Sequence, residues 1–221
     1  MQMISLRLAI LLLIICMVAS YLLGSINFAI IVTRIFIRKD IRDFGSGNAG
    51  ATNVLRTVGK TAAALTFLGD VLKGVLSVLL AKSVFIFLLN MPDFFWAQYL
   101  CGLCALSGHL FPIFYKFKGG KGVLVSAGAM AAVAPFAILT CLAVFLIVVL
   151  ITRYVSLSSI VACATFPFAL WGYRVLTDNT RHLILEIILG SIFAVSIIIM
   201  HKTNIKRLIK GTESKLGSKK Q

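Results

Sequence analysis

The chain has 221 residues, of which 60% are hydrophobic and only 13% are charged, and its mean hydropathy is +1.01. These values exclude an ordinary soluble globular protein and predict an all-α integral membrane protein. The formal net charge of +15 indicates a basic face that would attract anionic lipid.

Hydrophobic segments predict transmembrane helices at about residues 6–33, 61–89, 96–114, 156–172 and 183–200. The first segment begins like a signal peptide but stays apolar through Val32, so we expect an uncleaved span. Residues 122–152 could form one very long helix or two shorter helices broken at Ala134 and Pro135, because proline removes a helix hydrogen bond. With that break the chain has seven spans.

The distribution of basic residues decides between these alternatives. With the break, the positive-inside rule places the N-terminus outside and the C-terminus in the cytoplasm. The cytoplasmic side then carries most of the basic residues: Arg34, Arg38, Lys39, Arg42, Arg56, Lys60, Lys116, Lys118, Lys121, Arg153 and seven Lys or Arg residues after His201. Only Arg7, Arg174 and Arg181 remain outside. Without the break, the basic C-terminal tail would face the wrong way, so we predict a single seven-helix domain over residues 1–221.

This topology gathers four polar segments on the cytoplasmic face: 44–60, 115–122, 153–159 and 201–213. The first contains GSGNAG at 45–50, but no strand precedes it, which excludes a dinucleotide site. FKGGKG at 117–122 is not a Walker A loop, because Tyr115 stands where its first glycine should be. Two glycine-rich loops whose N–H groups could point at an oxyanion, beside Arg56, Lys118 and Lys121, predict a phosphate site. Tight turns between close-packed spans are the alternative.

Isolated polar residues admit two interpretations each. Asp70 and Lys73 share a helix face inside a span, as a structural ion pair or as reactive groups. His109 is better explained by packing than by orienting the second loop. His201 ends the last span, with Asn204 three residues later, and could be a base, a hydrogen-bonding group or a helix-end cap.

Ser156, Ser158 and Ser159 begin the sixth span, where serines cap helices but could also complete a phosphate site. The five cysteines lie in apolar runs, and their odd number argues against a disulfide framework. We find no pattern for a covalent nucleophile or a metal.

Three segments then identify a family. DFGSGNAGATNVLRTVGK, GHLFPIFYKFKGGKGV and HKTNIKRLIKGTE, in this order and spacing, resemble the three motifs of the bacterial acyl-phosphate-dependent glycerol-3-phosphate acyltransferases. YLLGSINFA, GDVLKG and RYVSLSS are lesser matches, so the resemblance covers the whole chain. The departures are small: Asn27 where proline or a small residue is usual, Lys202 where arginine is common, and VLVSAG after GGKG where VAT is usual.

The resemblance implies a multi-pass enzyme of the bacterial inner membrane with a cytoplasmic active site. It implies transfer of a fatty acyl group from acyl phosphate to the sn-1 hydroxyl of glycerol 3-phosphate, which gives lysophosphatidic acid and phosphate and begins phospholipid synthesis. The expected partners are these two substrates and membrane lipids. A monomer is expected, with no cofactor, metal or nucleic acid.

The resemblance and the loop analysis together give the expected site. The catalytic residues are expected to be His201, Asn204, Ser46, Arg56 and Lys121. Substrate or phosphate binding is expected from Gly45, Gly47, Thr52, Asn53, Lys118, Gly119, Gly120 and Ser159.

Two other classes of protein fit part of the sequence. A transporter of an organic phosphate would use the basic loops for binding and Asp70 with Lys73 as a relay, but transporters usually bind at mid-membrane and often show internal repeats. A scaffold held to anionic lipid would need only charge, so replacing Lys121 with arginine should then be harmless.

Overall fold

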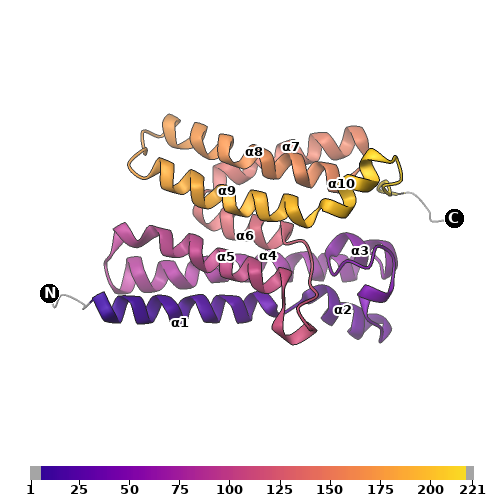
Figure 1. Ribbon diagram of the computed structural model, residues 1–221, viewed down its shortest axis with the longest axis horizontal. Coiled ribbons are helices and arrows are strands. Elements are labelled where there is room, and N and C mark those ends of the chain that lie inside the picture. Colours follow the sequence, from indigo (N-terminus) through magenta and orange to yellow (C-terminus); the bar gives the residue numbers. More distant parts are fainter. Residues whose placement is uncertain (1–5, 218–221) are drawn as a thin grey trace. The chain divides into compact units, whose positions relative to one another are not determined.

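The computed structural model describes residues 6–217, and this part of the chain is helical and contains no strand (Figure 1). The chain divides into two compact units, Met1–Val133 and Ala134–Gln221. The division falls at the predicted proline break, because α6 ends at Val133 and α7 begins at Pro135. Of the predicted basic tail, Lys219 and Lys220 lie outside the described residues.

Unit 1 is built on four packed helices, α1, α4, α5 and α6. Its α-helices are α1 (Leu6–Ser25), α2 (Phe28–Ile37), α3 (Ala51–Thr57), α4 (Lys60–Lys82), α5 (Trp96–Leu110) and α6 (Val123–Val133). Short 3₁₀ segments lie at Ile41–Asp43, Pro92–Phe95 and Ile113–Tyr115, and a π-helical turn at Ser83–Leu88 extends α4. Helix α4 packs against α5 and α6, and α1 packs along α5.

The first hydrophobic segment is not one continuous helix. The sequence predicts a span over 6–33, but α1 ends at Ser25 and α2 begins at Phe28. Asn27 is the N-cap of α2, because its backbone is extended and its side-chain oxygen accepts a hydrogen bond from Ile30 N–H at 3.2 Å. This residue was one of the departures from the family pattern, and here it begins a helix.

Glycines allow the helices of unit 1 to approach closely. A Cβ on Gly108 would meet the backbone of Tyr21 and Ser25 in α1, and a Cβ on Gly74 would meet the backbone of Val125 and Ala129 in α6. Because helices in lipid gain little from hydrophobic contact with each other, small residues at interfaces are a main source of their packing energy. The glycines therefore fix the distance of α5 from α1 and of α4 from α6.

We expect Gly74→Ala to lower the free energy of unfolding by about 1–3 kcal/mol, since the new methyl group must displace backbone of α6. Gly172→Ala in α8 is the matched control, because a Cβ there meets no other atom within 4 Å and alanine favours helix. Thermal unfolding in detergent checks both variants. Equal melting temperatures would contradict the packing role of Gly74.

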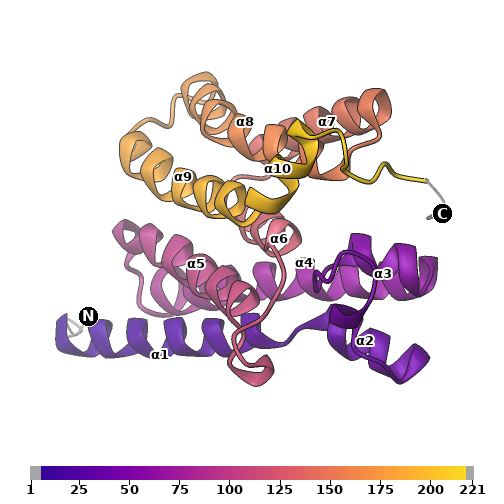
Figure 2. The same ribbon diagram turned by 45° about the vertical axis from the view of Figure 1, so that its right-hand side comes forward.

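Unit 2 consists of four helices joined by short connections (Figure 2). They are α7 (Pro135–Thr152), α8 (Val155–Leu176), α9 (Leu183–Met200) and the short α10 (Lys202–Ile209). Helix α8 packs against α7 and against α9. In α8 and α9, Arg174 donates two hydrogen bonds to Glu186, at 2.6 and 2.8 Å, which pairs the charges of these residues.

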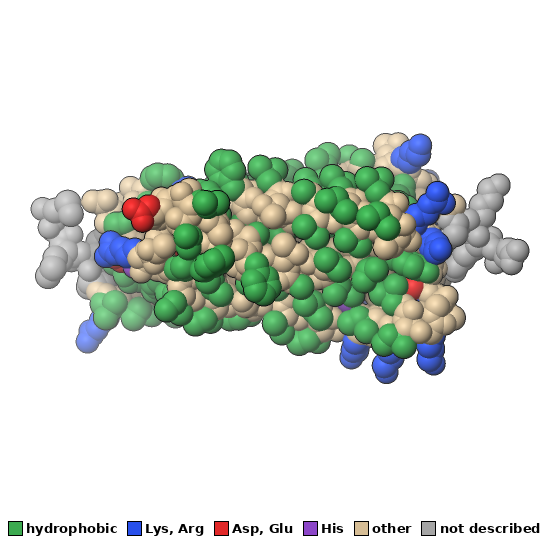
Figure 3. All heavy atoms as spheres, turned by 90° about the horizontal axis from the view of Figure 1, so that it is seen from above, with side chains coloured by type: hydrophobic (Ala, Val, Ile, Leu, Met, Phe, Trp, Pro, Cys, Tyr) green, Lys and Arg blue, Asp and Glu red, His purple; other side chains and the backbone are tan. Residues whose placement is uncertain are grey.

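Six segments are long and apolar enough to cross a membrane: Leu6–Ile37, Lys60–Leu88, Pro92–Tyr115, Pro135–Thr152, Val155–Leu176 and Leu183–Met200. Helix α6, with 11 residues, is apolar but shorter, so the count of seven spans stays a prediction. Hydrophobic side chains are spread along the face seen in Figure 3, and Lys and Arg side chains lie toward its ends. This is the distribution that a bilayer requires of a multi-pass protein.

Candidate functional site

Asn53 organises the first glycine-rich loop. It lies on the first turn of α3 and is 2% exposed. Its side-chain NH₂ group shares its two N–H donors among three backbone carbonyls, those of Ile41 (3.2 Å), Phe44 (2.9 Å) and Asn48 (3.1 Å), and its Oδ1 accepts from Ser46 N–H (3.0 Å). One amide therefore fixes both ends of residues 41–48.

The glycines of this loop serve the backbone. Gly45 and Gly47 have φ of +60° and +71°, which glycine adopts without strain, and a Cβ on Gly45 would collide with Asn53 Oδ1. The loop was expected to direct N–H groups at an anion. Instead, Ser46 N–H donates to Asn53, Gly47 N–H to Phe44 O at 2.9 Å, and Gly50 N–H to Asn48 O at 3.1 Å. These three donors maintain the fold of the loop.

The second loop is attached to α5. Gly119 N–H donates to Leu110 O at 3.2 Å, and Gly120 N–H donates to His109 O at 3.1 Å, so these groups also bind protein carbonyls. A Cβ on Gly119 would collide with the His109 carbonyl. A Cβ on Gly120 would meet both the His109 ring and Ala49 O in the first loop. Gly120 therefore lies where the two loops contact each other.

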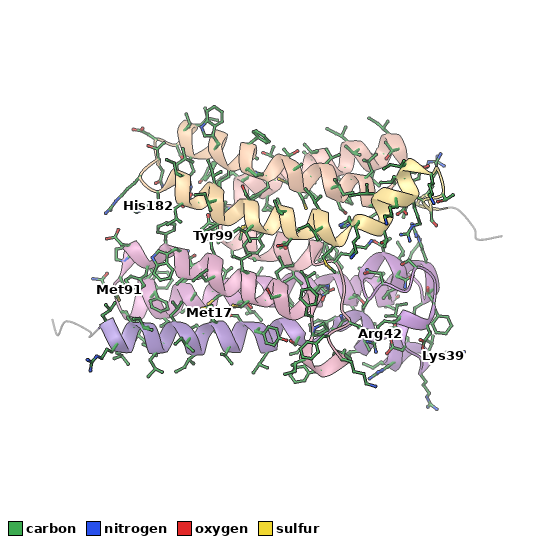
Figure 4. All side chains as sticks on the ribbon, viewed as in Figure 1. Met17, Lys39, Arg42, Met91, Tyr99 and His182 are labelled. Carbon is green, nitrogen blue, oxygen red and sulfur yellow. The ribbon has the colours of Figure 1, made fainter. Side chains whose placement is uncertain are left out.

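Arg42 makes a second connection between the loops. Its guanidinium donates to Asp40 at 3.0 and 2.9 Å, and to the carbonyls of Tyr115 at 3.1 Å and Lys118 at 3.3 Å. The Arg42 hydrogen bonds hold the pKa of Asp40 below its usual value, although burial raises it. Arg42 and Lys39 lie at one end of unit 1, and Met91 lies at the other (Figure 4). Arg42 was expected only as a topology-setting charge, so its structural role is a new finding.

Five N–H groups of the two loops, those of Ser46, Gly47, Gly50, Gly119 and Gly120, therefore bind oxygen atoms of the protein itself. Arg56 and Lys118 are exposed, Lys121 is half-buried, and Ser46 presents its side chain on the exposed loop. Thr52, half-buried, precedes Asn53 on the same turn of α3. The two loops thus contact each other in unit 1, through Gly120 with Ala49 and through Arg42.

His201 follows α9 and precedes α10, where the chain bends. It is 2% exposed, and its Nδ1 lies 2.8 Å from the carbonyl oxygen of Ile197. Because a carbonyl can only accept, Nδ1 carries the proton, and in the neutral ring the basic lone pair belongs to Nε2. Its hydrogen bond to the last turn of α9 therefore fixes both the orientation and the tautomer of a candidate base.

Glu213 joins the polar residues of unit 2. Its Oε1 accepts from Ser156 Oγ at 2.8 Å and from Asn204 Nδ2 at 2.6 Å, while its Oε2 accepts from Arg207 Nε at 2.6 Å. This carboxylate connects the start of α8 to α10. We call Glu213 and its three partners, Ser156, Asn204 and Arg207, the Glu213 clamp. Glu213 fixes the amide of Asn204, one of the predicted catalytic residues.

Ser159, the predicted phosphate ligand of α8, is buried, and its hydroxyl donates to the carbonyl of Val155 at 2.9 Å. Ser158 makes the equivalent bond to Tyr154 O at 2.8 Å. Ser156 differs from these two serines, because its hydroxyl donates to Glu213, which lies outside α8.

The clamp predicts a dependence of stability on pH. Burial raises the pKa of Glu213, but the bonds from Arg207, Asn204 and Ser156 outweigh it and leave the pKa below the ordinary value of 4.5. The clamp therefore stabilises the fold fully above about pH 4.5, and this contribution falls as the pH drops through the folded-state pKa. Glu213→Gln should lower the melting temperature at pH 7, and the difference from the unmodified protein should shrink in acid. A constant difference down to pH 3 would contradict this.

The sequence did not indicate three of these functions. Glu213 was noted only as part of a motif, Ser156 as a helix cap or a part of the phosphate site, and Arg42 only as a charge. Each acts on a partner far along the chain, for example 57 residues between Ser156 and Glu213. The one available signal was the position of Glu213 in the third motif, two residues after Gly211, since glycine commonly follows the end of a helix.

Comparison with known proteins gives one consistent result. A sequence model of the family described as "Glycerol-3-phosphate acyltransferase" matches residues 14–211. The glycerol-3-phosphate acyltransferase of Clostridioides difficile strain 630 is 48% identical over 208 residues, covering 94% of this chain and 97% of that relative. The enzyme of the same name from Bordetella pertussis strain Tohama I is 42% identical over 206 residues, covering 92% of this chain and 91% of that relative.

The fold is similar to two crystal structures of PlsY, an integral membrane glycerol 3-phosphate acyltransferase. The glycerol 3-phosphate form has a TM-score of 0.79 and 34% sequence identity, covering 93% of this chain and 96% of PlsY. The lysophosphatidic acid form has a TM-score of 0.77 and 33% identity, covering 93% of this chain and 95% of PlsY.

Proposed function

This chain belongs to the glycerol-3-phosphate acyltransferase family, a multi-pass integral membrane enzyme family, and we propose that it uses acyl phosphate to acylate the sn-1 hydroxyl of glycerol 3-phosphate. The products are lysophosphatidic acid and phosphate. The observation that carries the proposal is the similarity over nearly the full chain to PlsY, whose crystal structures are named for a glycerol 3-phosphate form and a lysophosphatidic acid form.

In the proposed reaction, the sn-1 oxygen attacks the acyl carbonyl carbon directly. The new ester C–O bond forms, the bond between the carbonyl carbon and the phosphate oxygen breaks, and phosphate leaves with the bonding electrons. Because acyl phosphate is a mixed anhydride with a good leaving group, no enzyme nucleophile is needed. Positioning and charge stabilisation supply the rate enhancement.

The proposed roles follow the chemistry of the side chains. Arg56 and Lys121, with Lys118, supply positive charge, and Ser46 supplies a hydroxyl group for phosphate binding. Ser159 adds its hydroxyl only by giving up its hydrogen bond to Val155 O. His201 accepts the hydroxyl proton at Nε2, since its Nδ1–H is held by Ile197 O. Asn204, held by Glu213, orients glycerol 3-phosphate.

The remaining residues serve the loops that carry these groups. Gly45, Gly47 and Asn53 shape the first loop, Thr52 lies beside them, and Gly119 and Gly120 allow the second loop to approach α5.

We further propose that residues 1–221 act as one monomeric seven-helix domain in the bacterial inner membrane, with the N-terminus outside and the active site cytoplasmic. The arrangement of basic residues supports this topology, since α6 and α7 separate at Pro135 as the positive-inside argument requires. Tagged N- and C-termini probed in intact and in opened cells would test the orientation.

In the decisive test, the purified protein is incubated with isotopically labelled glycerol 3-phosphate. One reaction contains acyl phosphate as the donor, and the other contains acyl-CoA. We expect lysophosphatidic acid from acyl phosphate alone. Product from acyl-CoA alone would overturn the proposed donor, and no product from either donor with folded protein would overturn the proposed reaction.

A further inference from the structure

A buried lysine fills the break between α1 and α2. The amino group of Lys73, in α4, donates to the carbonyl oxygens of Gly24 at 3.0 Å and Ile26 at 2.7 Å. Carbonyls at the end of a helix lack intrahelical partners, and at membrane depth water does not replace them. The lysine therefore satisfies the polar groups that the break exposes and complements the negative end of the α1 dipole.

A third acceptor completes the environment of this amino group. His109 Nδ1 lies 2.9 Å from Lys73 Nζ, and Asp70 Oδ1 lies 3.0 Å away. An ammonium group has three N–H donors, which match the two carbonyls and His109 Nδ1. Asp70 then compensates the charge, because the ion pair is 1–2% exposed in its side chains.

This arrangement determines the state of His109. Because a lysine ammonium cannot accept a hydrogen bond, His109 Nδ1 must be the acceptor, and the ring proton lies on Nε2. His109 Nε2 faces Gly120, where an added Cβ would collide with it. The ring thus fills the space between Lys73 and the second glycine-rich loop.

The backbone of His109 holds the same loop. Its carbonyl accepts from Gly120 N–H at 3.1 Å, one residue after Gly119 N–H bonds to Leu110 O. Lys121, the proposed phosphate ligand, follows directly. The position of Lys121 therefore depends on His109, and that of the His109 ring depends on Lys73.

We propose that Lys73 and His109 are positioning residues of the acyltransferase: Lys73 closes the α1–α2 break and locks His109, whose ring supports the loop that carries Lys121. The expected effect on KM rests on the proposed function. The expected effect on the mobility of the second loop rests on the geometry alone.

The test compares two variants with the unmodified full chain. His109→Asn keeps an acceptor near the position of Nδ1 for Lys73 but removes the ring beside Gly120. Lys73→Met removes all three donors at similar length. Hydrogen–deuterium exchange should become about tenfold faster in residues 116–123 in both variants. The KM for the substrates should rise about tenfold in His109→Asn, with its melting temperature nearly retained.

The control is Arg174→Met with Glu186→Gln, which removes another ion pair with little exposure, held at 2.6 Å in unit 2. We expect this variant to lose stability and to keep the exchange of residues 116–123 and the KM unchanged. If Lys73→Met does not fold, His109→Asn still tests the support of the loop, since Lys73 keeps its hydrogen bonds to Gly24 and Ile26 in that variant.

Three results would count against the inference. Unchanged exchange in residues 116–123 of His109→Asn would overturn the support of the loop. Faster exchange with an unchanged KM would reduce His109 to a structural residue. Equal changes in the control would make the effect one of general stability. Absence of lysophosphatidic acid from the unmodified protein would instead overturn the proposed function, and the exchange data would still decide on the loop.

Discussion

Replacing His201 with alanine is expected to lower turnover by about 100- to 10,000-fold, the usual contribution of a positioned general base. The hydrogen bond of Nδ1 to Ile197 O leaves Nε2 as the basic atom in a residue that is 2% exposed. The alanine variant loses the base and also the bond to the end of α9. The measurement is the initial rate of lysophosphatidic acid formation with both substrates saturating.

His201→Asn separates the base from the structural bond. The asparagine NH₂ group can still donate to Ile197 O, but nothing replaces Nε2. If His201 takes the proton, this variant should be as slow as alanine while melting near the unmodified protein. If a phosphate of the substrate takes the proton instead, His201→Asn should keep most of its turnover. His182→Ala, at the opposite end of α9, is the matched control and should change neither property.

Asn53→Asp should be among the most harmful single-atom replacements in the chain. The substitution exchanges an NH₂ group for an oxygen at the point where three carbonyls converge, so it removes both N–H donors and adds repulsion between oxygen atoms. We expect a loss of about 3 kcal/mol or more in the free energy of unfolding. We also expect a fall of about 100-fold in rate, because the same side chain holds the loop at Ser46, a proposed phosphate-binding residue.

Thermal unfolding and initial rates measure these two effects. Asn179→Asp, at an exposed turn in unit 2, introduces the same charge where no such convergence exists and should be nearly neutral. Melting temperatures of the two variants within a degree of each other would refute the role of Asn53.

Hydrophobicity and charge predicted the helical segments well because both are local properties of the sequence. Pro135 marked the separation of α6 and α7 correctly, since proline acts through its own ring. The break at Asn27 was missed, because the segment stays apolar on both sides and its stabilising partner, Lys73, lies in another helix. Helix α3 was also missed, as its residues were interpreted as part of a polar loop.

The residues of the candidate site could be predicted from the sequence, but the hydrogen bonds that hold them in place could not. The motifs indicated the loops, His201 and Asn204. They did not show that the N–H groups of Ser46, Gly47, Gly50, Gly119 and Gly120 would bind oxygen atoms of the protein itself. They also did not show that Glu213 holds Asn204. That contact forms only because the chain after α10 turns back toward this helix.

The Glu213 clamp also sets the order in which the protein can mature during synthesis. Glu213 follows α10, so the ribosome has translated every helix of the described chain before this carboxylate emerges. Until then, Ser156 and Asn204 lack their shared acceptor, and unit 2 is a set of inserted helices without its finished polar cluster. A nascent chain released after Lys210 would therefore contain every helix of the described chain but lack the carboxylate that joins Ser156, Asn204 and Arg207.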